Sequence, residues 1–216
     1  MRANFWIKTW NEGNIGFHQC GVHPALEKHW PALKPGTSVL VPLCGKSRDM
    51  LWIEERGLDV IGVEFVESAV VDFFRENDLD WRETTQDGHR CYCANSRNIR
   101  IFVTDFIQWV EDYRGQPIEA LYDRAALVAL PEDMRMTYVT ACQKILGPSP
   151  RGLLVSLKFD PDVMEGPPFN VSPEEVERLW HAQLGLVEQT DVLSDMPRAV
   201  ASGVQSLDEC CWLFHD

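Results

Sequence analysis

The amino-acid sequence predicts an α/β fold: a mostly parallel β-sheet with helices on both faces and an antiparallel strand pair at the C-terminus. Short apolar runs alternate with segments of helical periodicity along most of the chain, a pattern typical of parallel strands joined by helices. Residues 38–64 form one complete unit of strand, glycine turn, helix and strand. The segments 186–193 and 203–214 look like two further strands, which close the sheet as the antiparallel pair.

The size and charge of the chain narrow the classes of function. Its 216 residues contain no Ser/Gly-rich linker and no internal repeat, so residues 1–216 are expected to form a single domain. A formal net charge of -13 would repel polyanions, which argues against nucleic acid and anionic membranes as partners. No stretch approaches the length of a transmembrane helix, and no signal peptide is evident. We therefore expect a cytoplasmic, monomeric protein whose seven cysteines are reduced.

The first segment, residues 1–34, is interpreted as an N-terminal helical lid region. Residues 4–17 combine aromatic side chains with a turn-rich stretch, a composition suited to a mobile cover. A second helix is predicted at residues 23–33, ended by Pro35-Gly36. The aromatic residues that would give this lid its apolar face are Trp6, Trp10 and Phe17.

Residues 38–64 carry the main functional signal. The first strand ends in the turn Cys44-Gly45-Lys46-Ser47, and the second ends in Glu64. A helix N-terminus and a carboxylate at one sheet edge suit an anionic group and ribose hydroxyls. A phosphate-binding P-loop would need a glycine where Leu40 stands, and a dinucleotide fold would need G-x-G-x-x-G, which is absent. A nucleoside cofactor without phosphates, such as S-adenosylmethionine (SAM), and an ordinary βα turn remain as alternatives.

The remaining elements follow the same alternation. Helices are predicted at residues 67–77, 106–113 and 131–146, and after the capping box Ser172-Pro173-Glu174-Glu175. Strands are predicted at residues 99–103, 120–122 and 152–157, and a hairpin at 81–98 with its turn at Asp87-Gly88.

Polar residues follow successive strands at the points where the strands end. They are Cys44-Gly45, Glu64, Thr104-Asp105 and Asp123-Arg124. Because the carboxyl ends of parallel strands share one crevice where ligands bind, we favour a binding site over solvated loop residues. Asp123 has two interpretations: it orients Arg124, or it caps the strand end.

Other candidate residues carry weaker signals. His89, Cys91 and Cys93 alternate on the predicted hairpin, but no fourth ligand at zinc-site spacing is evident, so we expect no metal. Cys44 has no histidine near it in sequence and is interpreted as a small turn residue. His18 is expected to orient its loop rather than to act as a base.

Several motifs resemble those of one family. The chain is similar to thiopurine S-methyltransferases, SAM-dependent class I methyltransferases whose bacterial members are also linked to tellurite resistance. The motifs span nearly the whole chain in family order: Trp6-x-x-x-Trp10 with Gly16-Phe17-His18, Pro42-Leu43-Cys44-Gly45-Lys46, Val60-x-Gly62-Val63-Glu64, Tyr122-Asp123-Arg124-Ala125-Ala126-Leu127 and Gly166-Pro167-Pro168-Phe169.

The resemblance implies a Rossmann-like class I methyltransferase sheet with SAM as cofactor and S-adenosylhomocysteine as product. By resemblance, Trp10 covers the cofactor, and Glu64 accepts hydrogen bonds from its ribose hydroxyls. Arg124 lies near the methionine part and the acceptor, and is the candidate catalytic residue. The full set of implied cofactor contacts is Trp6, Trp10, Phe17, Leu43, Glu64, Thr104, Asp105 and Arg124.

The chemistry agrees with these placements. SAM is a sulfonium cation, and aromatic faces attract cations by roughly 0.5 to 2 kcal/mol. Methyl transfer is an in-line displacement in which proximity and desolvation dominate. A thiol acceptor needs only deprotonation, and Arg124 is a permanent cation that could stabilise a thiolate.

We therefore predict methyl transfer from SAM to the sulfur of small aromatic or heterocyclic thiols such as thiopurines. The alternatives are methylation of tellurium or selenium species, a SAM-binding module without turnover, and a nicotinamide oxidoreductase. The missing glycine fingerprint argues against the last of these.

Overall fold

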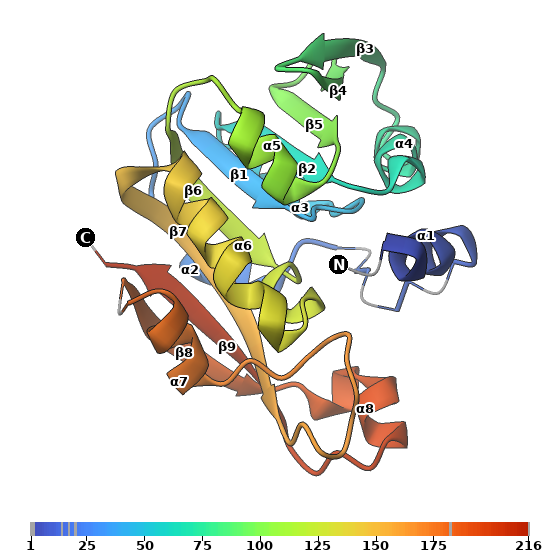
Figure 1. Ribbon diagram of the computed structural model, residues 1–216, viewed down its shortest axis with the longest axis vertical. Coiled ribbons are helices and arrows are strands. Elements are labelled where there is room, and N and C mark those ends of the chain that lie inside the picture. Colours follow the sequence, from blue (N-terminus) through green and yellow to red (C-terminus); the bar gives the residue numbers. More distant parts are fainter. Residues whose placement is uncertain (1–2, 14, 17, 20, 182, 216) are drawn as a thin grey trace.

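The computed structural model describes residues 3–13, 15, 16, 18, 19, 21–181 and 183–215. Within these residues the strands form one nine-stranded sheet in the order β3-β4-β5-β2-β1-β6-β7-β9-β8 (Figure 1). The strands are β1 (Ser38–Pro42), β2 (Asp59–Glu64), β3 (Trp81–Gln86), β4 (His89–Ala94), β5 (Ile99–Val103), β6 (Ile118–Arg124), β7 (Leu146–Phe159), β8 (Leu184–Asp191) and β9 (Leu207–Phe214).

The sheet has a parallel centre and antiparallel margins. Strands β5, β2, β1, β6 and β7 run parallel to their neighbours. At one margin β3 and β4 form an antiparallel hairpin on β5, and at the other β9 pairs antiparallel with both β7 and β8. The predicted α/β class and the antiparallel C-terminal pair are confirmed. The chain order reverses between β1 and β6, a position where ligands bind in open α/β sheets.

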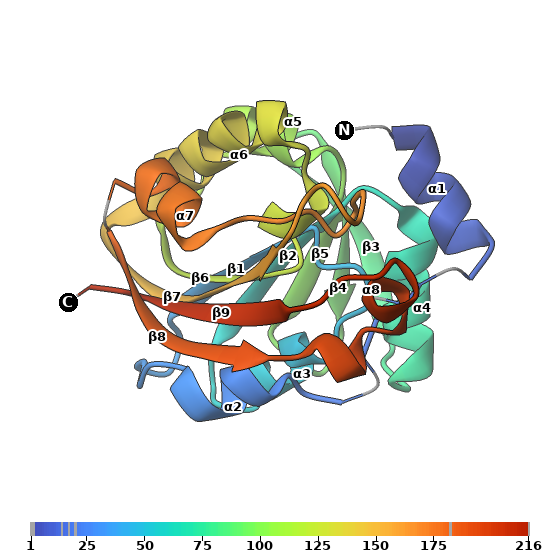
Figure 2. The ribbon, with the colours of Figure 1, turned by 90° about the horizontal axis from the view of Figure 1, so that it is seen from below.

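Helices cover both faces of the sheet. In Figure 2, α5, α6 and α7 lie on one side of the strands, and α2 and α3 lie on the other. The helices are α1 (Ala3–Asn11), α2 (Pro24–His29), α3 (Asp49–Glu54), α4 (Glu67–Glu76), α5 (Phe106–Asp112), α6 (Glu132–Ile145), α7 (Pro173–Leu179) and α8 (Pro197–Ala201), with short 3₁₀ turns η1 (Leu127–Ala129) and η2 (Leu193–Asp195).

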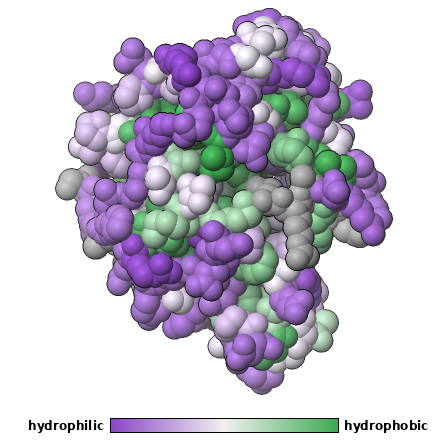
Figure 3. Space-filling view, viewed as in Figure 1, coloured by the Kyte–Doolittle hydropathy of each residue, from purple (hydrophilic) through white to green (hydrophobic). Residues whose placement is uncertain are grey.

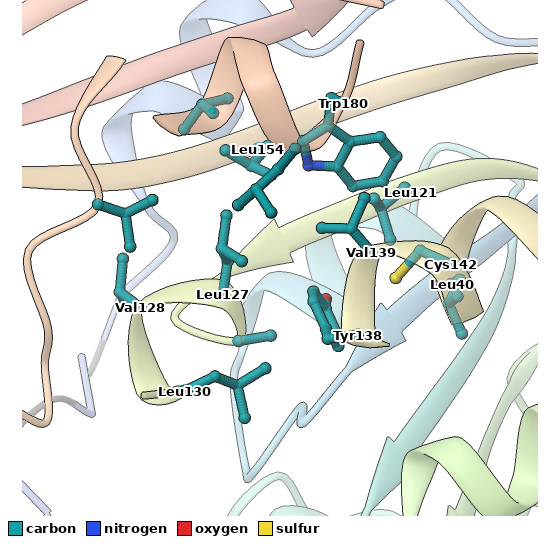
Figure 4. Close-up of a cluster of buried hydrophobic side chains, with 14 of the residues drawn as sticks. Leu40, Leu121, Leu127, Val128, Leu130, Tyr138, Val139, Cys142, Leu154 and Trp180 are labelled. Carbon is teal, nitrogen blue, oxygen red and sulfur yellow. The ribbon is translucent and has the colours of Figure 1, made fainter. Parts of the chain in front are cut away.

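Neighbouring residues of the central strands pack into two separate cores. In β1, Val39 and Val41 contact the core under α2, α3 and α4, whereas Leu40 contacts the core under α5, α6 and α7. This alternation follows from the strand period of two, and burial on both faces explains why the run is continuously apolar. Figure 4 shows the second core, where Tyr138 and Trp180 lie among the leucines and valines of the sheet and helices.

The ends of several elements differ from their predicted positions; for example, the strands predicted at residues 186–193 and 203–214 are β8 and β9, which span Leu184–Asp191 and Leu207–Phe214. The helix predicted at residues 23–33 is α2, which stops at His29 because Pro31 disfavours helical backbone at Trp30, found at φ -57 and ψ 128. The strand predicted at residues 152–157 is β7, which starts at Leu146, directly after α6. Its early part has few apolar residues but pairs with β6 through Ile118 and Leu146.

Other local predictions are confirmed. Ser172 accepts a hydrogen bond from the backbone N–H of Glu175 at 3.3 Å, so the expected cap starts α7. The hairpin turns at Asp87 and Gly88, which both have positive φ. Among the described helices, none combines the length and apolar character that a bilayer crossing requires.

Candidate functional site

A cavity of about 400 Å³ lies at the carboxyl ends of β1, β2 and β6. Helix α1 and the segment containing Pro167 and Pro168 form its other walls. In the space-filling view, hydrophobic residues show at several places near the middle of this face, within a largely hydrophilic surface (Figure 3). The predicted site residues that line the cavity are Trp6, Trp10, Leu43, Glu64 and Arg124.

Three predicted residues lie elsewhere or are not described. Thr104 and Asp105 follow β5 but are not among the residues that line the cavity. The Thr104 hydroxyl and the Nδ1 atom of His89 share a hydrogen bond of 2.9 Å, and Asp105 caps α5 by accepting from the backbone N–H groups of its first turn. Phe17 lies outside the described residues. Their roles in cofactor binding stay predictions.

The turn after β1 is sharp and tightly covered. Leu43 has φ 49 and Gly45 has φ 51, so the backbone reverses through left-handed conformations. A Cβ atom on Gly45 would lie 2.8 Å from Cζ2 of Trp10. Only glycine therefore allows the indole of α1 to approach this turn so closely.

Glu64 ties the end of β2 to the turn after β1. Its Oε2 accepts a hydrogen bond from the backbone N–H of Gly45 at 2.8 Å, and its Oε1 accepts from Val66 at 2.7 Å. Burial raises the pKa of this carboxyl group, and bonds from the backbone of Val66, Gly45 and Phe65 oppose that rise. A buried carboxylate that faces a cavity and is held by backbone donors is well placed to accept further hydrogen bonds.

Asp123 caps the turn that follows β6. One carboxylate oxygen accepts from the backbone N–H groups of Ala126 and Leu127 at 3.1 Å, and the other accepts from the Tyr138 hydroxyl at 2.7 Å. Burial raises the pKa of Asp123 to about 6. These bonds favour the strand-end cap over the alternative role of orienting Arg124, the next residue, whose side chain lines the cavity.

Asp49, at the start of α3, is a buried connection that sequence reasoning missed. Its carboxylate accepts from the backbone N–H of His23 at 2.8 Å, from the Ser47 hydroxyl at 3.0 Å and from the Tyr122 hydroxyl at 2.8 Å. These donors belong to the segment before α2, the cavity turn and β6. Only the Ser47 contact is local in sequence, so only that part of the network was open to prediction.

Lys46 and Arg198 are among the cations that line the cavity without having been predicted. Lys46 is almost fully buried and donates to Glu76 at 2.6 Å. Arg198, on α8, donates to the backbone carbonyls of Glu165 and Pro167 and so holds the proline-rich segment at the cavity. The lysine was visible within its motif, whereas the arginine comes from a helix that the sequence pattern did not predict.

The cysteines of the hairpin face one way, as their spacing indicates. The Sγ atoms of Cys91 and Cys93 lie 3.7 Å apart, and His89 is bonded to Thr104 and Asp112. Among the described residues there is no group of three His, Cys, Asp or Glu side chains placed to hold a metal ion.

The sheet order, with a cavity at its carboxyl edge, defines a class I SAM-dependent methyltransferase fold. An N1-methyltransferase from Burkholderia thailandensis, solved with 1,6-didemethyltoxoflavin and S-adenosylhomocysteine, aligns with a TM-score of 0.64 at 17% identity, over 99% of this chain and 87% of that one. An arsenic(III) SAM methyltransferase from Chlamydomonas reinhardtii aligns with a TM-score of 0.58 at 9% identity, over 90% and 71% of the two chains. These two likenesses concern the fold alone.

Sequence comparison identifies the family. Residues 1–216 match the model of the thiopurine S-methyltransferase family. Proteins named thiopurine S-methyltransferase are 44% identical in Pseudomonas fluorescens, over 97% of this chain and 96% of that protein, and 42% identical in Bordetella pertussis, over 96% and 95%. The chain belongs to the thiopurine S-methyltransferase family, and the resemblance carried by its motifs is confirmed.

Proposed function

We propose that this protein transfers a methyl group from SAM to the sulfur of small aromatic or heterocyclic thiols, thiopurines among them. The observation that carries the proposal is the cavity in which Trp10, Glu64 and Arg124 come together at the reversal point of the sheet. Family membership over the full chain agrees with it. The alternative is a SAM-binding module that uses the same site without methyl transfer, and the experiment must exclude it.

The residues of the cavity suit SAM. Trp6 and Trp10 supply aromatic faces, which attract a sulfonium cation. Glu64 would accept from the ribose hydroxyls while it keeps its bonds to the turn, because each carboxylate oxygen has two lone pairs. Leu43 would contact the cofactor at the end of β1. When bound, SAM supplies an electrophilic methyl carbon.

The acceptor side depends on charge and on the exclusion of water. Arg124 would stabilise a thiolate in the cavity of a chain whose formal net charge is -13. A closed cavity removes water from the acceptor sulfur and strengthens this interaction. We propose that residues 1–34 act as the lid, because α1 supplies several cavity-lining residues and lies beside α4 (Figure 1).

The cellular setting of this proposal follows from charge and composition. A strongly acidic protein would be repelled by nucleic acid, so we expect a small-molecule substrate and no nucleic-acid partner. We further expect a monomer that works in the cytoplasm, where the free cysteines stay reduced.

Cofactor and acceptor can be tested in one series. Calorimetric titration of the protein with SAM and, separately, with NAD should show binding of SAM alone. A methylation screen with SAM should then include thiopurines, other aromatic thiols, tellurite and selenite. Methylated thiols support the proposal, whereas methylation of the chalcogen oxyanions alone would support the metalloid alternative. SAM binding without any methyl transfer would indicate a binding module.

A further inference from the structure

His18 lines the same cavity as Arg124 and Leu43, on the segment that connects α1 to α2. Its side chain is half-buried, and its backbone N–H donates to the carbonyl of Ile15 at 2.8 Å, which fixes a turn at this point. Within the part of the chain that the structure describes, no hydrogen bond or ion pair holds its imidazole ring. The ring is thus a titratable group that faces the space where an acceptor would lie.

The charges around His18 favour its neutral form. Burial lowers the pKa of the imidazole, and the nearby cations Lys46 and Arg124 lower it further. Glu76 and Asp49 act in the opposite direction. Glu76 is bonded to Lys46, and three donors surround the Asp49 carboxylate, so neither is a dedicated partner of the ring. Near neutral pH the imidazole therefore has a nitrogen lone pair available.

The other candidate bases of the cavity are less suitable. Both oxygens of Glu64 accept backbone hydrogen bonds and hold the turn. Glu12 is exposed beyond the end of α1 and pairs with Lys8 at 3.7 Å. Cys44 is buried, and burial raises the pKa of its thiol well above the usual value. Among the described residues that line the cavity, His18 is the remaining neutral base.

The place of His18 in the cavity lining changes the role expected from its sequence position, which was to orient its loop. We propose that His18 is the general base that takes the proton from a neutral thiol acceptor in this cavity. The inference rests on the proposed methyl transfer and extends its substrate class to thiols too weakly acidic to ionise near neutral pH. The acceptor S–H bond breaks, its electron pair stays on sulfur and the proton passes to the imidazole nitrogen. The acceptor sulfur uses that pair to bond the methyl carbon, and the pair of the broken donor C–S bond returns to the donor sulfur. The imidazolium then loses its proton to water.

Arg124 and His18 would have separate roles in the reaction. Arg124 stabilises the negative charge that develops on the acceptor sulfur, and His18 removes the proton that would block methylation. An acidic aromatic thiol already enters as its thiolate and makes little use of the base. A weakly acidic thiol depends on it, and general-base assistance typically contributes about 10² to 10⁴-fold.

The test compares His18→Gln with His215→Gln, the same change at an exposed histidine near the C-terminus, on the opposite side of the molecule from α1 in Figures 1 and 2. His18→Gln should lower kcat/KM for a weakly acidic alkyl thiol by about 10² to 10⁴-fold, with a much smaller loss for an acidic aromatic thiol. His215→Gln should match the wild type. Equal losses for both thiols, or none, in a folded His18 variant would overturn the assignment.

The wild-type pH profile gives a second measurement that does not depend on the folding of a variant. With a base in the site, kcat/KM for the weakly acidic thiol should reach a plateau above the pKa of His18, well below the pKa of the thiol. A rise of tenfold per pH unit up to the pKa of the thiol would mean that only solution thiolate reacts, and would overturn the proposal. If the acidic thiol is not methylated at all, the proposed function itself fails and this inference with it.

A third readout needs no turnover. In protein without methyl donor, the imidazole ¹⁵N resonances of His18 should titrate below the usual range and shift when the weakly acidic thiol is added. The resonances of His215 should not respond to the thiol. A His18 signal that is unchanged at saturating thiol would place the acceptor elsewhere and contradict the proposal.

Discussion

The carboxylate of Glu64 accepts a hydrogen bond from the backbone N–H of Gly45 at 2.8 Å, which joins the end of β2 to the glycine turn after β1. The two residues are neighbours in space because β1 and β2 pair in parallel register, with Pro42 opposite Val63. The same side chain therefore shapes the cavity wall, and in the proposed function it also accepts hydrogen bonds from the cofactor. Loss of this carboxylate is expected to affect both functions.

Replacement of Glu64 by alanine should lower both SAM affinity and stability. We expect SAM binding to weaken by about 1.5 to 3 kcal/mol, because a charged acceptor for the ribose hydroxyls is lost. The free energy of unfolding should fall by about 1 to 3 kcal/mol, because buried backbone N–H groups lose their acceptor. Calorimetry and thermal unfolding measure the two effects. Glu177→Ala, at an exposed position on α7, is the control. Unchanged SAM affinity in a folded Glu64 variant would remove Glu64 from the ribose site.

Gly45→Ala should displace α1, part of the proposed lid. The new Cβ would lie 2.8 Å from Cζ2 of Trp10, so the indole and α1 must move. Gly88→Ala is the matched control, because Gly88 also has positive φ but its new Cβ would have no neighbouring atom within 4 Å. Both changes should cost about 1 to 2 kcal/mol of backbone strain, but only Gly45→Ala should weaken SAM binding and speed proteolysis of residues 3–13. Equal SAM affinity in the two variants would show that Trp10 does not cover the cofactor.

Arg124 should be only partly replaceable by lysine. We expect Arg124→Ala to lower kcat/KM for an aromatic thiol by about 10- to 100-fold, the loss of one charge-assisted interaction. Arg124→Lys should recover part of this, because it keeps the charge but loses the planar fork of donors. Calorimetry with SAM separates the roles: unchanged SAM affinity places Arg124 on the acceptor side. Wild-type kinetics in both variants would exclude Arg124 from the site.

The sequence was most informative where structure depends on neighbouring residues. The strand–turn–helix–strand unit around Gly45 follows from apolar periodicity and one glycine, and Glu64 from its place at a strand end. The early end of α2 could also have been predicted, because Pro31 follows Trp30. The length of β7 could not have been predicted, because its first residues include few apolar side chains and are ordered by pairing with β6.

The candidate site was harder to predict where it depends on distant parts of the chain. Thr104 and Asp105 stand at a strand end, as expected, but β5 is separated from β1 by β2, and Asp105 is used to cap α5. Arg198 reaches the cavity only through the packing of α8 against the segment at Pro167. Polar residues at strand ends predict which edge of the sheet carries the site. The position of the cavity along that edge depends on the loops that fold over it.

Asp123 should make the free energy of unfolding fall as the pH rises. Its native pKa of about 6 exceeds the usual value of 3.8, so the native state keeps a proton that the unfolded chain has released. Raising the pH from about 3 to about 7 should therefore destabilise the wild type relative to Asp123→Asn, by on the order of 3 kcal/mol, and the difference should level off above that range. Denaturant unfolding of both proteins across this pH range measures the difference.

Asp112→Asn is the control of opposite sign, because hydrogen bonds from Gln108 and His89 lower the pKa of Asp112. The wild type should therefore lose stability relative to that variant as the pH falls. If the free energies of unfolding of the wild type and Asp123→Asn change with pH in the same way, the pKa of Asp123 is the same in the folded and unfolded protein. Burial would then not have raised it, which contradicts the prediction.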